Sequence, residues 1–180
     1  SFTEYSAQLA QRGVVLSRLE RTDIIQKGLV ERASANGGTI DSEAAEQSSL
    51  LEEVPDLVEC PNVISGSFSE EFLTLPPEVL KTTMIHHQHF VPVVGKNHEL
   101  TSTFLAVTNT SSANADRVAN NASRVLAARL RDARFFWDAD RQIKLEARLD
   151  RLDTLLFHKN LGSYKDKTVR MERLSVWIAE

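Results

Sequence analysis

Two β-rich runs joined by a short polar loop place the strongest constraint on how this chain can fold. The runs are Phe90–Val94 and Leu100–Thr108, and Gly95-Lys96-Asn97-His98-Glu99 separates them. This pattern predicts an antiparallel hairpin with a five-residue loop. A further run, Asn62–Phe68, has the composition of a strand. We therefore expect a small antiparallel sheet in the middle of the chain.

Helical patterns lie on both sides of this sheet region. Capping residues, helix-stop glycines and apolar residues at helical spacing define them. The predicted helices are Phe2–Arg12, Arg18–Ala35, one capped by Asp41 or Ser42 that stops near Val54-Pro55, one from Pro76-Pro77 to about Ile85, and roughly 115–138, 140–157 and 164–179. Breaks are expected at 138–140 and at 160–163. Helices on both sides of a small antiparallel sheet indicate an α+β fold, with a set of long helices at the C-terminal end.

Charge divides the chain unevenly, although its net charge is only −4. Residues 1–112 hold 7 Lys or Arg against 15 Asp or Glu, whereas residues 113–180 hold 14 against 10. We therefore predict a mixed α/β body with an acidic surface over 1–112 and a basic helical region over 113–180. The basic region could bind phosphates, and a solvated helical surface of mixed charge is the alternative.

No catalytic or metal site is predicted from the sequence. The histidines of His86-His87-Gln88-His89 cannot all converge, since neither a helix nor a strand brings the three together. No HExxH, GxGxxG, GxSxG or phosphate-cradling loop is present. The single cysteine, Cys60, excludes an intrachain disulfide and fits a reducing compartment. No run approaches the roughly eighteen apolar residues of a membrane span.

An arginine-rich helical segment is the best candidate for contact with nucleic acid. Arg124, Arg131 and Arg134 are separated by seven and three residues and can share a face, whereas Arg129 falls on a neighbouring one. The guanidinium group can make two parallel charged hydrogen bonds to a phosphate. An alternative is that Asp132 and Asp138 pair with these arginines and that the long stems only cover apolar surface.

Two neighbouring stretches extend this candidate. Lys165 and Lys167 lie near the start of a predicted helix and form a similar basic site. The triplet Phe135-Phe136-Trp137 sits in an apolar helical stripe, which favours a core position over a platform for stacking bases.

Four ordered blocks of residues resemble the β subunit of bacterial heterotetrameric glycyl-tRNA synthetase. Departures from the family pattern occur at residues 120–123 and at His89, Val91 and Ala127. The weakest block is Ser49–Val54 with Leu57, Val58, Glu59 and Pro61; the others contain Phe72, Leu73, Leu75, Pro76, Glu78, Val79, Leu80, Thr83, Met84, His87, Gln88, Pro92 and Val93, then Arg124, Val125, Leu126, Ala128, Arg129, Leu130, Asp132, Ala133, Phe135, Phe136 and Asp140, and finally Leu161, Gly162, Ser163, Asp166, Lys167 and Arg170.

This resemblance implies a non-catalytic central fragment of a tRNA-recognition subunit. Its partners would be tRNA(Gly) and a separate catalytic α subunit that uses ATP and Mg²⁺, in a cytoplasmic two-plus-two assembly, with no role for DNA or a membrane. The end of the chain would begin a following HD-like domain. On this interpretation the tRNA-binding candidates are Arg124, Arg129, Arg131, Lys165 and Lys167. The alternatives are a purely architectural module and a metal-dependent hydrolase built on the histidine cluster.

Overall fold

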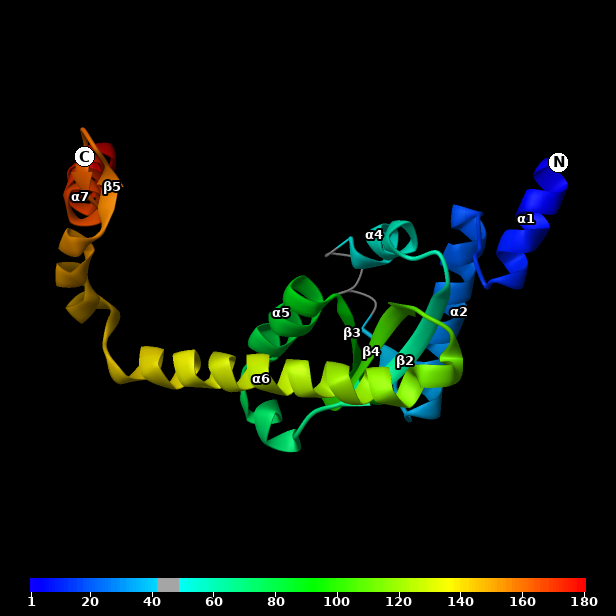
Figure 1. Cartoon of the computed structure of the whole chain (residues 1–180). Coiled ribbons are helices and arrows are strands. Elements are labelled where there is room, and N and C mark those ends of the chain that lie inside the picture. Colours follow the sequence, from blue (N-terminus) through cyan, green and yellow to red (C-terminus); the bar gives the residue numbers. More distant parts are fainter. Residues whose placement is uncertain (42–48) are drawn as a thin grey trace. The chain divides into compact units, whose positions relative to one another are not determined.

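A computed structural model describes residues 1–41 and 49–180 of the chain (Figure 1). It forms two compact units, Ser1–Arg134 and Phe135–Glu180. Helices and a small antiparallel sheet make up the structure, which confirms the predicted α+β class. The boundary between the two units falls within the long helix α6 (Ala115–Gln142). The division into an acidic body over 1–112 and a basic region over 113–180 stays a prediction.

The helices of the first unit begin where local capping favours them. Ser1 and Glu4 form a capping box at the start of α1 (Phe2–Gln11), and Ser17 caps α2 (Arg18–Ala35). A proline at the first position starts α5 (Pro77–Gln88). The other helical segments of this unit are α4 (Leu50–Leu57), the short 3-10 helices η1 (Glu70–Thr74) and η2 (Ser112–Asn114), and the first part of α6 (Ala115–Gln142).

The sheet contains four antiparallel strands in the order β1-β3-β4-β2. The predicted hairpin is confirmed as β3 (Phe90–Val94) and β4 (Leu100–Asn109), and the third predicted strand is β2 (Pro61–Ser67). β2 pairs with β4 over its whole length, from Pro61↔Asn109 to Ser67↔Thr103. The strand β1 (Thr39–Ile40) was not predicted, because two residues carry no usable alternation. Among the strands of residues 1–41 and 49–180, β2 lies at an edge of the sheet, because it pairs only with β4.

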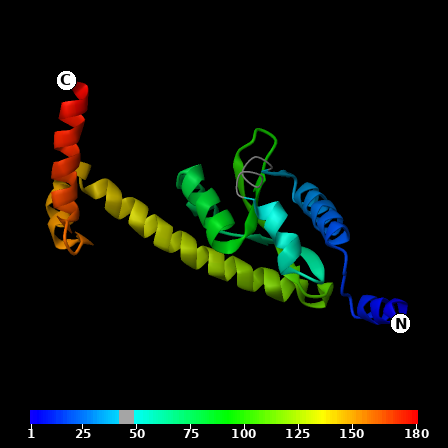
Figure 2. The ribbon, with the colours of Figure 1, turned by 90° about the horizontal axis from the view of Figure 1, so that it is seen from above.

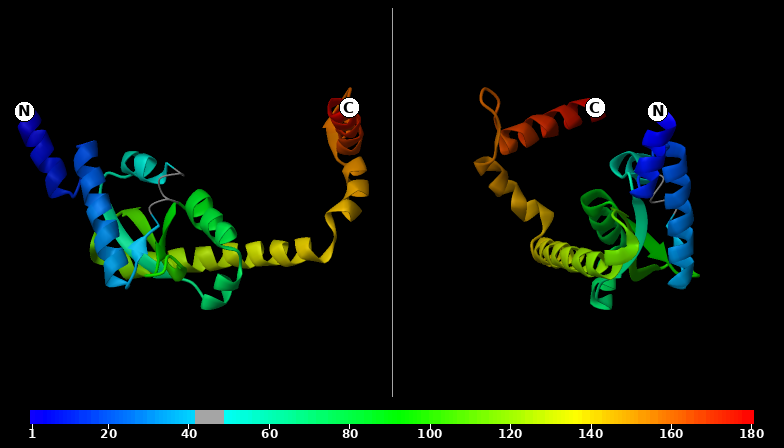
Figure 3. Two further views of the ribbon diagram at one scale, coloured as in Figure 1. Left: turned by 180° about the vertical axis from the view of Figure 1, so that it is seen from behind. Right: turned by 45° about the vertical axis from the view of Figure 1, so that its right-hand side comes forward.

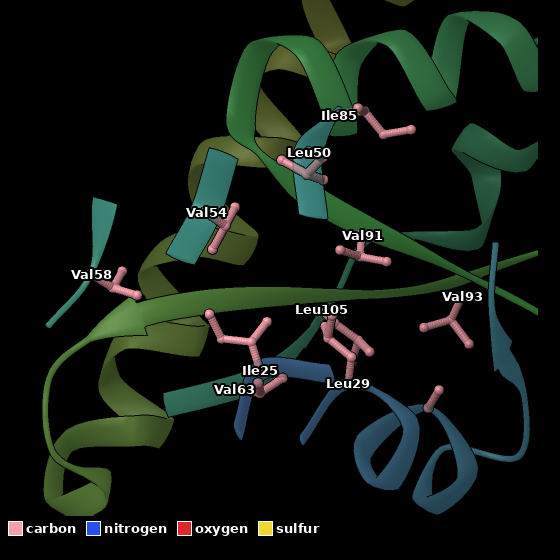
Figure 4. Close-up of a cluster of buried hydrophobic side chains, with 11 residues drawn as sticks. Ile25, Leu29, Leu50, Val54, Val58, Val63, Ile85, Val91, Val93 and Leu105 are labelled. Carbon is pink, nitrogen blue, oxygen red and sulfur yellow. The ribbon is translucent and has the colours of Figure 1, made fainter. Parts of the chain in front are cut away.

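One face of the sheet packs against α2 and forms the main apolar core. Ile25, Leu29 and Ala33 recur on one side of α2 and are at most 1% exposed. Figure 4 shows this cluster, in which Leu105 lies beside Leu29 and the side chains of α4 complete the group. The remaining members are Leu50, Val54, Val58, Val63, Ile85, Val91 and Val93.

The opposite face of the sheet carries α6. Figures 2 and 3 show the first half of α6 running along the sheet, with α2 on the other side. A Cβ atom at Gly66 would lie 2.8 Å from the Ser123 hydroxyl and would also meet the Phe104 ring, so glycine permits this close approach. Leu126 and Leu130 of α6 are fully buried. They fix which face of this helix turns to solvent.

The second unit is small and buries no residue fully. It contains the end of α6, the 3-10 helix η3 (Leu145–Thr154), the hairpin of β5 (Leu156–His158) and β6 (Gly162–Ser163), and α7 (Tyr164–Ala179). Ser163 and Asp166 form a capping box at the start of α7. The rings of Phe157 and Tyr164 meet edge to face at 5.3 Å.

Several predicted boundaries are wrong. The break expected at 138–140 does not occur, because α6 continues to Gln142. The predicted helix over 140–157 is instead a 3-10 helix followed by a strand. α5 extends three residues past Ile85 to Gln88. The third helix continues through Pro55 to Leu57, and the part of that prediction over residues 42–48 lies outside the described residues.

Candidate nucleic-acid interface

Three arginines form a straight row on the solvent side of α6. Arg117, Arg124 and Arg131 are spaced by seven residues, so each lies almost directly above the last and about 10.5 Å along the helix axis. All three are exposed. Leu126 and Leu130 hold the opposite side of the helix in the core. We call Arg117, Arg124 and Arg131 the arginine row.

The surface between the arginines is small and open. A recess of about 610 Å³ is lined by Asn121, Arg124, Val125, Ala127, Ala128 and Arg131. The two alanines leave room between the long side chains, and the Asn121 amide offers both donors and an acceptor. Within the described part of the chain, no ion pair or side-chain hydrogen bond engages Arg124 or Arg131. Their donors are available to an external anion.

Arg129 is also exposed, but it lies away from the row. Five residues separate it from Arg124, which rotates it by about 140° around the helix. The alternative that Asp132 or Asp138 neutralises these arginines finds no support among residues 1–41 and 49–180, where neither carboxylate lies within ion-pair distance of an arginine. Arg129 therefore offers a charge on a second side of the same helix.

Arg134 has a structural partner instead. Its Nη2 donates to the carbonyl oxygen of Glu71 at 2.6 Å and to the hydroxyl of Thr74 at 2.7 Å. Its guanidinium carbon lies 5.8 Å from the centre of the Phe72 ring. These contacts attach α6 to η1. Although Arg134 belongs to the arginine-rich segment, its guanidinium group is engaged by these contacts within the first unit.

The two lysine candidates lie in the second unit and contact neighbouring side chains. Lys165 Nζ is 2.9 Å from Asp150 Oδ1, and this hydrogen bond raises the pKa of Lys165. Lys167 Nζ lies 4.3 Å from the centre of the Phe157 ring and 5.7 Å from that of Tyr164. Both lysines are half-buried. They are less available to a ligand than the arginines of the row.

The aromatic triplet is only partly in a core. Phe135 is 68% and Phe136 is 63% exposed, so the core position predicted for these two residues is wrong. Their rings contact each other edge to face at 5.5 Å. Trp137 is half-buried, and the Arg141 guanidinium lies 5.7 Å from its ring. The apolar stripe of the sequence therefore turns to solvent beyond Arg134.

The histidines lie around the end of α5 without a metal-like arrangement. His86 and His87 occupy the last turn, and His89 ends the helix in a left-handed conformation with φ of 55°. Among the described residues, no three His, Cys, Asp or Glu side chains converge as metal ligands do. None of the helices in the described part of the chain has the length and apolar character needed to cross a membrane.

Arg117 is the one member of the row that sequence reasoning missed. The arginine-rich segment draws attention to 124–134, and Arg117 stands alone between Asp116 and Val118. Counting in steps of seven back from Arg131 and Arg124 would have found it. The signal was present in the spacing, but it becomes convincing only when 115–142 is one unbroken helix.

Comparison with known proteins gives a consistent match over the whole chain. The model of a family described as "Glycyl-tRNA synthetase beta subunit" matches residues 1–180. A glycine–tRNA ligase beta subunit of Coxiella burnetii is 40% identical over 177 residues, which cover 98% of this chain and 25% of the relative. Those of Synechocystis and Syntrophomonas wolfei are each 38% identical, over 98% and 100% of this chain and 24% and 26% of the relatives. The chain thus spans about a quarter of the length of these curated relatives.

Proposed function

The chain belongs to the glycyl-tRNA synthetase β-subunit family, and we propose that it serves glycine–tRNA ligase by binding tRNA rather than by carrying out a reaction. In this proposal tRNA(Gly) lies along the arginine row, and Arg129 adds a further contact. Attachment of glycine, with its ATP and Mg²⁺, belongs to a separate catalytic α subunit in the cytoplasm. Lys165 and Lys167 make a smaller contribution, because Asp150 and the Phe157 ring already contact them.

The observation that carries the proposal is that arginines without a partner among the described residues stand on a helix whose other side is fixed in the core. Arg124 and Arg131 have no partner in the described part of the chain, yet they stand on a helix that Leu126 and Leu130 fix to the sheet. Phosphates of RNA are the ligands that an evenly spaced row of unpaired guanidinium groups fits best.

The test is tRNA binding by the complete enzyme at several salt concentrations. Each arginine that contacts a phosphate releases counterions, so its loss lowers the slope of log affinity against log salt by about 1. The double variant Arg124→Ala with Arg131→Ala should weaken binding and flatten the slope by about 2. The matched control is Arg12→Ala, which removes an exposed arginine from the C-cap of α1 and should leave both quantities unchanged. An unchanged slope in the double variant would reject the proposal.

A second candidate function, assembly with another polypeptide, is favoured by the surface of α7. Met171, Leu174 and Ile178 follow the i, i+3, i+7 spacing of one helical face. They are 55%, 58% and 75% exposed, and Trp177 beside them is 75% exposed. Such an apolar stripe is typical of a surface that another part of an assembly covers. This candidate corresponds to the architectural role, and it can coexist with tRNA binding.

The two candidates are separated by different variants. Leu174→Glu with Ile178→Glu places two charges on the α7 stripe and should reduce recovery of the α and β subunits as one complex. Arg173→Ala, which changes the same helix outside the stripe, is the control. If the Glu variant assembles normally and the arginine double variant loses tRNA affinity, only tRNA binding is supported. The opposite pair of results would support only assembly.

A further inference from the structure

The edge strand β2 presents free backbone groups on its outer side. Phe68 N donates to Ser102 O at 3.0 Å, one step beyond the register pair Ser67↔Thr103. Bonded residues alternate in an antiparallel ladder, so the backbone groups of Gly66 and Ile64 also bond to β4. The backbone N–H and C=O groups of Ser65 and Val63 point to the outer side of the strand. Ser67 confirms this direction, since its N–H turns away from β4 and donates to Ser123 Oγ at 3.1 Å. The outward amides of Val63 and Ser65 are about 6.8 Å apart.

Proline placement agrees with this assignment. Pro61 is the first residue of β2 and, by the same alternation, occupies an outward position. A proline there removes no bond of the ladder, which is why prolines occur on the outer side of edge strands. Pro92 of the inner strand β3 is a different case, because it stands at the register shift between Pro92 and Val94, and its carbonyl accepts from Asp41 N at 3.1 Å.

Two hollows follow this same outer edge. The larger, of about 340 Å³, lies between α2 and the first half of β2, where Ile24, Lys27 and Arg32 line it together with Val63. The smaller, of about 180 Å³, lies at the second half, where Ser65 and Ser67 face Asn36 at the end of α2 and Ala119, Asn120 and Ser123 of α6. A groove beside a helix and a free strand edge, with a hollow at each end, has the form of a site for an added strand.

We propose that the groove between α2 and β2 binds an extended segment of another polypeptide that adds a fifth strand to the sheet and carries an acidic side chain. The backbone of that strand would pair with the N–H and C=O groups of Val63 and Ser65. Its acidic side chain would enter the larger hollow, where Lys27 and Arg32 outnumber Glu31. A small side chain would fit the polar hollow by Ser65. This inference is independent of the proposed tRNA binding.

The chemistry of the edge suits two other occupants less well. RNA phosphates only accept hydrogen bonds, so they cannot pair with the outward carbonyl oxygens. A second copy pairing through its own β2 brings the sequence Pro-Asn-Val-Ile-Ser-Gly-Ser, which has no carboxylate for the Lys27 and Arg32 hollow. Glu31 lies 3.9 Å from Lys27 with both side chains largely exposed, and it leaves Arg32 without a carboxylate among the residues that the structure describes.

The proposal is tested with short synthetic peptides of alternating Val and Thr, one with a central Asp and one with Lys in its place. Binding to the complete chain is followed by ¹H–¹⁵N NMR titration. The Asp peptide should shift the Val63 and Ser65 amides and slow their hydrogen exchange, and it should bind roughly tenfold more tightly than the Lys peptide. Ser65→Pro should abolish binding while the spectrum stays folded, because it removes only the outward N–H.

A charge-reversed variant keeps the test decisive if Ser65→Pro fails to fold. Lys27→Glu with Arg32→Glu leaves the strand edge intact and should make the Lys peptide the tighter of the two. No binding of the Asp peptide at millimolar concentration would overturn the proposal. So would binding that neither variant alters, or dimerisation of the chain through β2 in the absence of peptide.

Discussion

The Nη2 atom of Arg134 lies 2.7 Å from the hydroxyl of Thr74, a residue 60 positions earlier in the chain. The same nitrogen donates to the Glu71 carbonyl at 2.6 Å, and the guanidinium lies near the Phe72 ring. The Arg134 side chain thus holds η1 in contact with α6. Within the arginine-rich segment this residue stabilises the fold, whereas Arg124 and Arg131 have no partner among the residues that the structure describes.

We predict that Arg134→Ala lowers the free energy of unfolding by about 1–2 kcal/mol, because two hydrogen bonds from a charged donor are lost at a partly exposed site. Urea unfolding measures this change. Arg129→Ala is the control, since it removes an exposed arginine from the same helix and should change stability by less than about 0.5 kcal/mol. Equal effects of the two substitutions would show that the Glu71 and Thr74 contacts contribute little.

We predict that Arg117→Ala lowers the salt slope of tRNA binding by about 1, as for each other member of the row. The reason is geometric, since Arg117 stands one step of seven residues before Arg124 on the same face. Filter binding or fluorescence anisotropy with the complete enzyme measures the slope. Arg117→Lys keeps the charge and should retain the slope while losing affinity, because a lysine makes no bidentate contact. A normal slope for Arg117→Ala would limit the interface to Arg124 and Arg131.

The start of α7 should respond to acid. Hydrogen bonds from the backbone N–H and the hydroxyl of Ser163, at 2.7 and 3.1 Å, hold the pKa of Asp166 below its ordinary value of 3.8. A carboxyl whose pKa is lowered by folding stabilises the folded state at pH above 3.8 and loses that contribution as the pH falls through the lowered value. Protection of the first-turn amides of α7 from hydrogen exchange, measured against the intrinsic exchange rate at each pH, should therefore decrease in that acidic range.

The variant Asp166→Asn isolates this effect. It should lower the protection of the first-turn amides at neutral pH and remove most of the further loss of protection on acidification, so that the two proteins converge at low pH. Glu172→Gln changes an exposed carboxylate further along α7 and should behave like the parent chain. A parent chain and Asp166→Asn variant that differ equally at every pH would contradict the role of the carboxylate charge.

We predict that Gly66→Ala destabilises the first unit by about 1–3 kcal/mol, the usual cost of overpacking. The added methyl would lie 2.8 Å from Ser123 Oγ and against the Phe104 ring, and neither the helix nor the core ring can withdraw freely. Thermal or urea unfolding measures the loss. Ser67→Ala, at the exposed neighbouring position, keeps the backbone bond to Ser123 and should be close to neutral. Equal stability of the two variants would mean that α6 can move away from the sheet.

The central hairpin and the start of α7 could be predicted because local chemistry determines them. The Gly95–Glu99 loop separates two runs of clear strand composition, and Ser163 stands three residues before Asp166 in a capping box. The prediction of a helix over 140–157 was wrong because the conformation of its last residues depends on strand pairing with residues later in the chain. Leu156–His158 forms a strand only because Gly162-Ser163 pairs with it, and Gly162 reaches the required φ of 81°.

The break expected at Asp138-Ala139-Asp140 shows a different limit. Two aspartates lower helix propensity only slightly, and no glycine or proline stands there to stop a helix that is already formed. The candidate site was limited in a similar way. Spacing places Arg124 and Arg131 on one face, but it cannot reveal that Arg134 reaches Glu71, 63 positions away. The exposure of Phe135 and Phe136 was equally hidden, since an apolar stripe does not state what covers it.

The seven-residue spacing on α6 has a consequence for how this segment can tolerate insertions. Adding one residue between Leu126 and Leu130 would turn Arg131 by about 100° relative to Arg124, and Leu126 and Leu130 would no longer lie on the same buried side of the helix. The buried leucines and the exposed arginines therefore both require the same number of residues between these positions. A substitution here changes a single charge. An insertion or deletion of one residue would disturb both the packing of the helix on the sheet and the alignment of the arginine row.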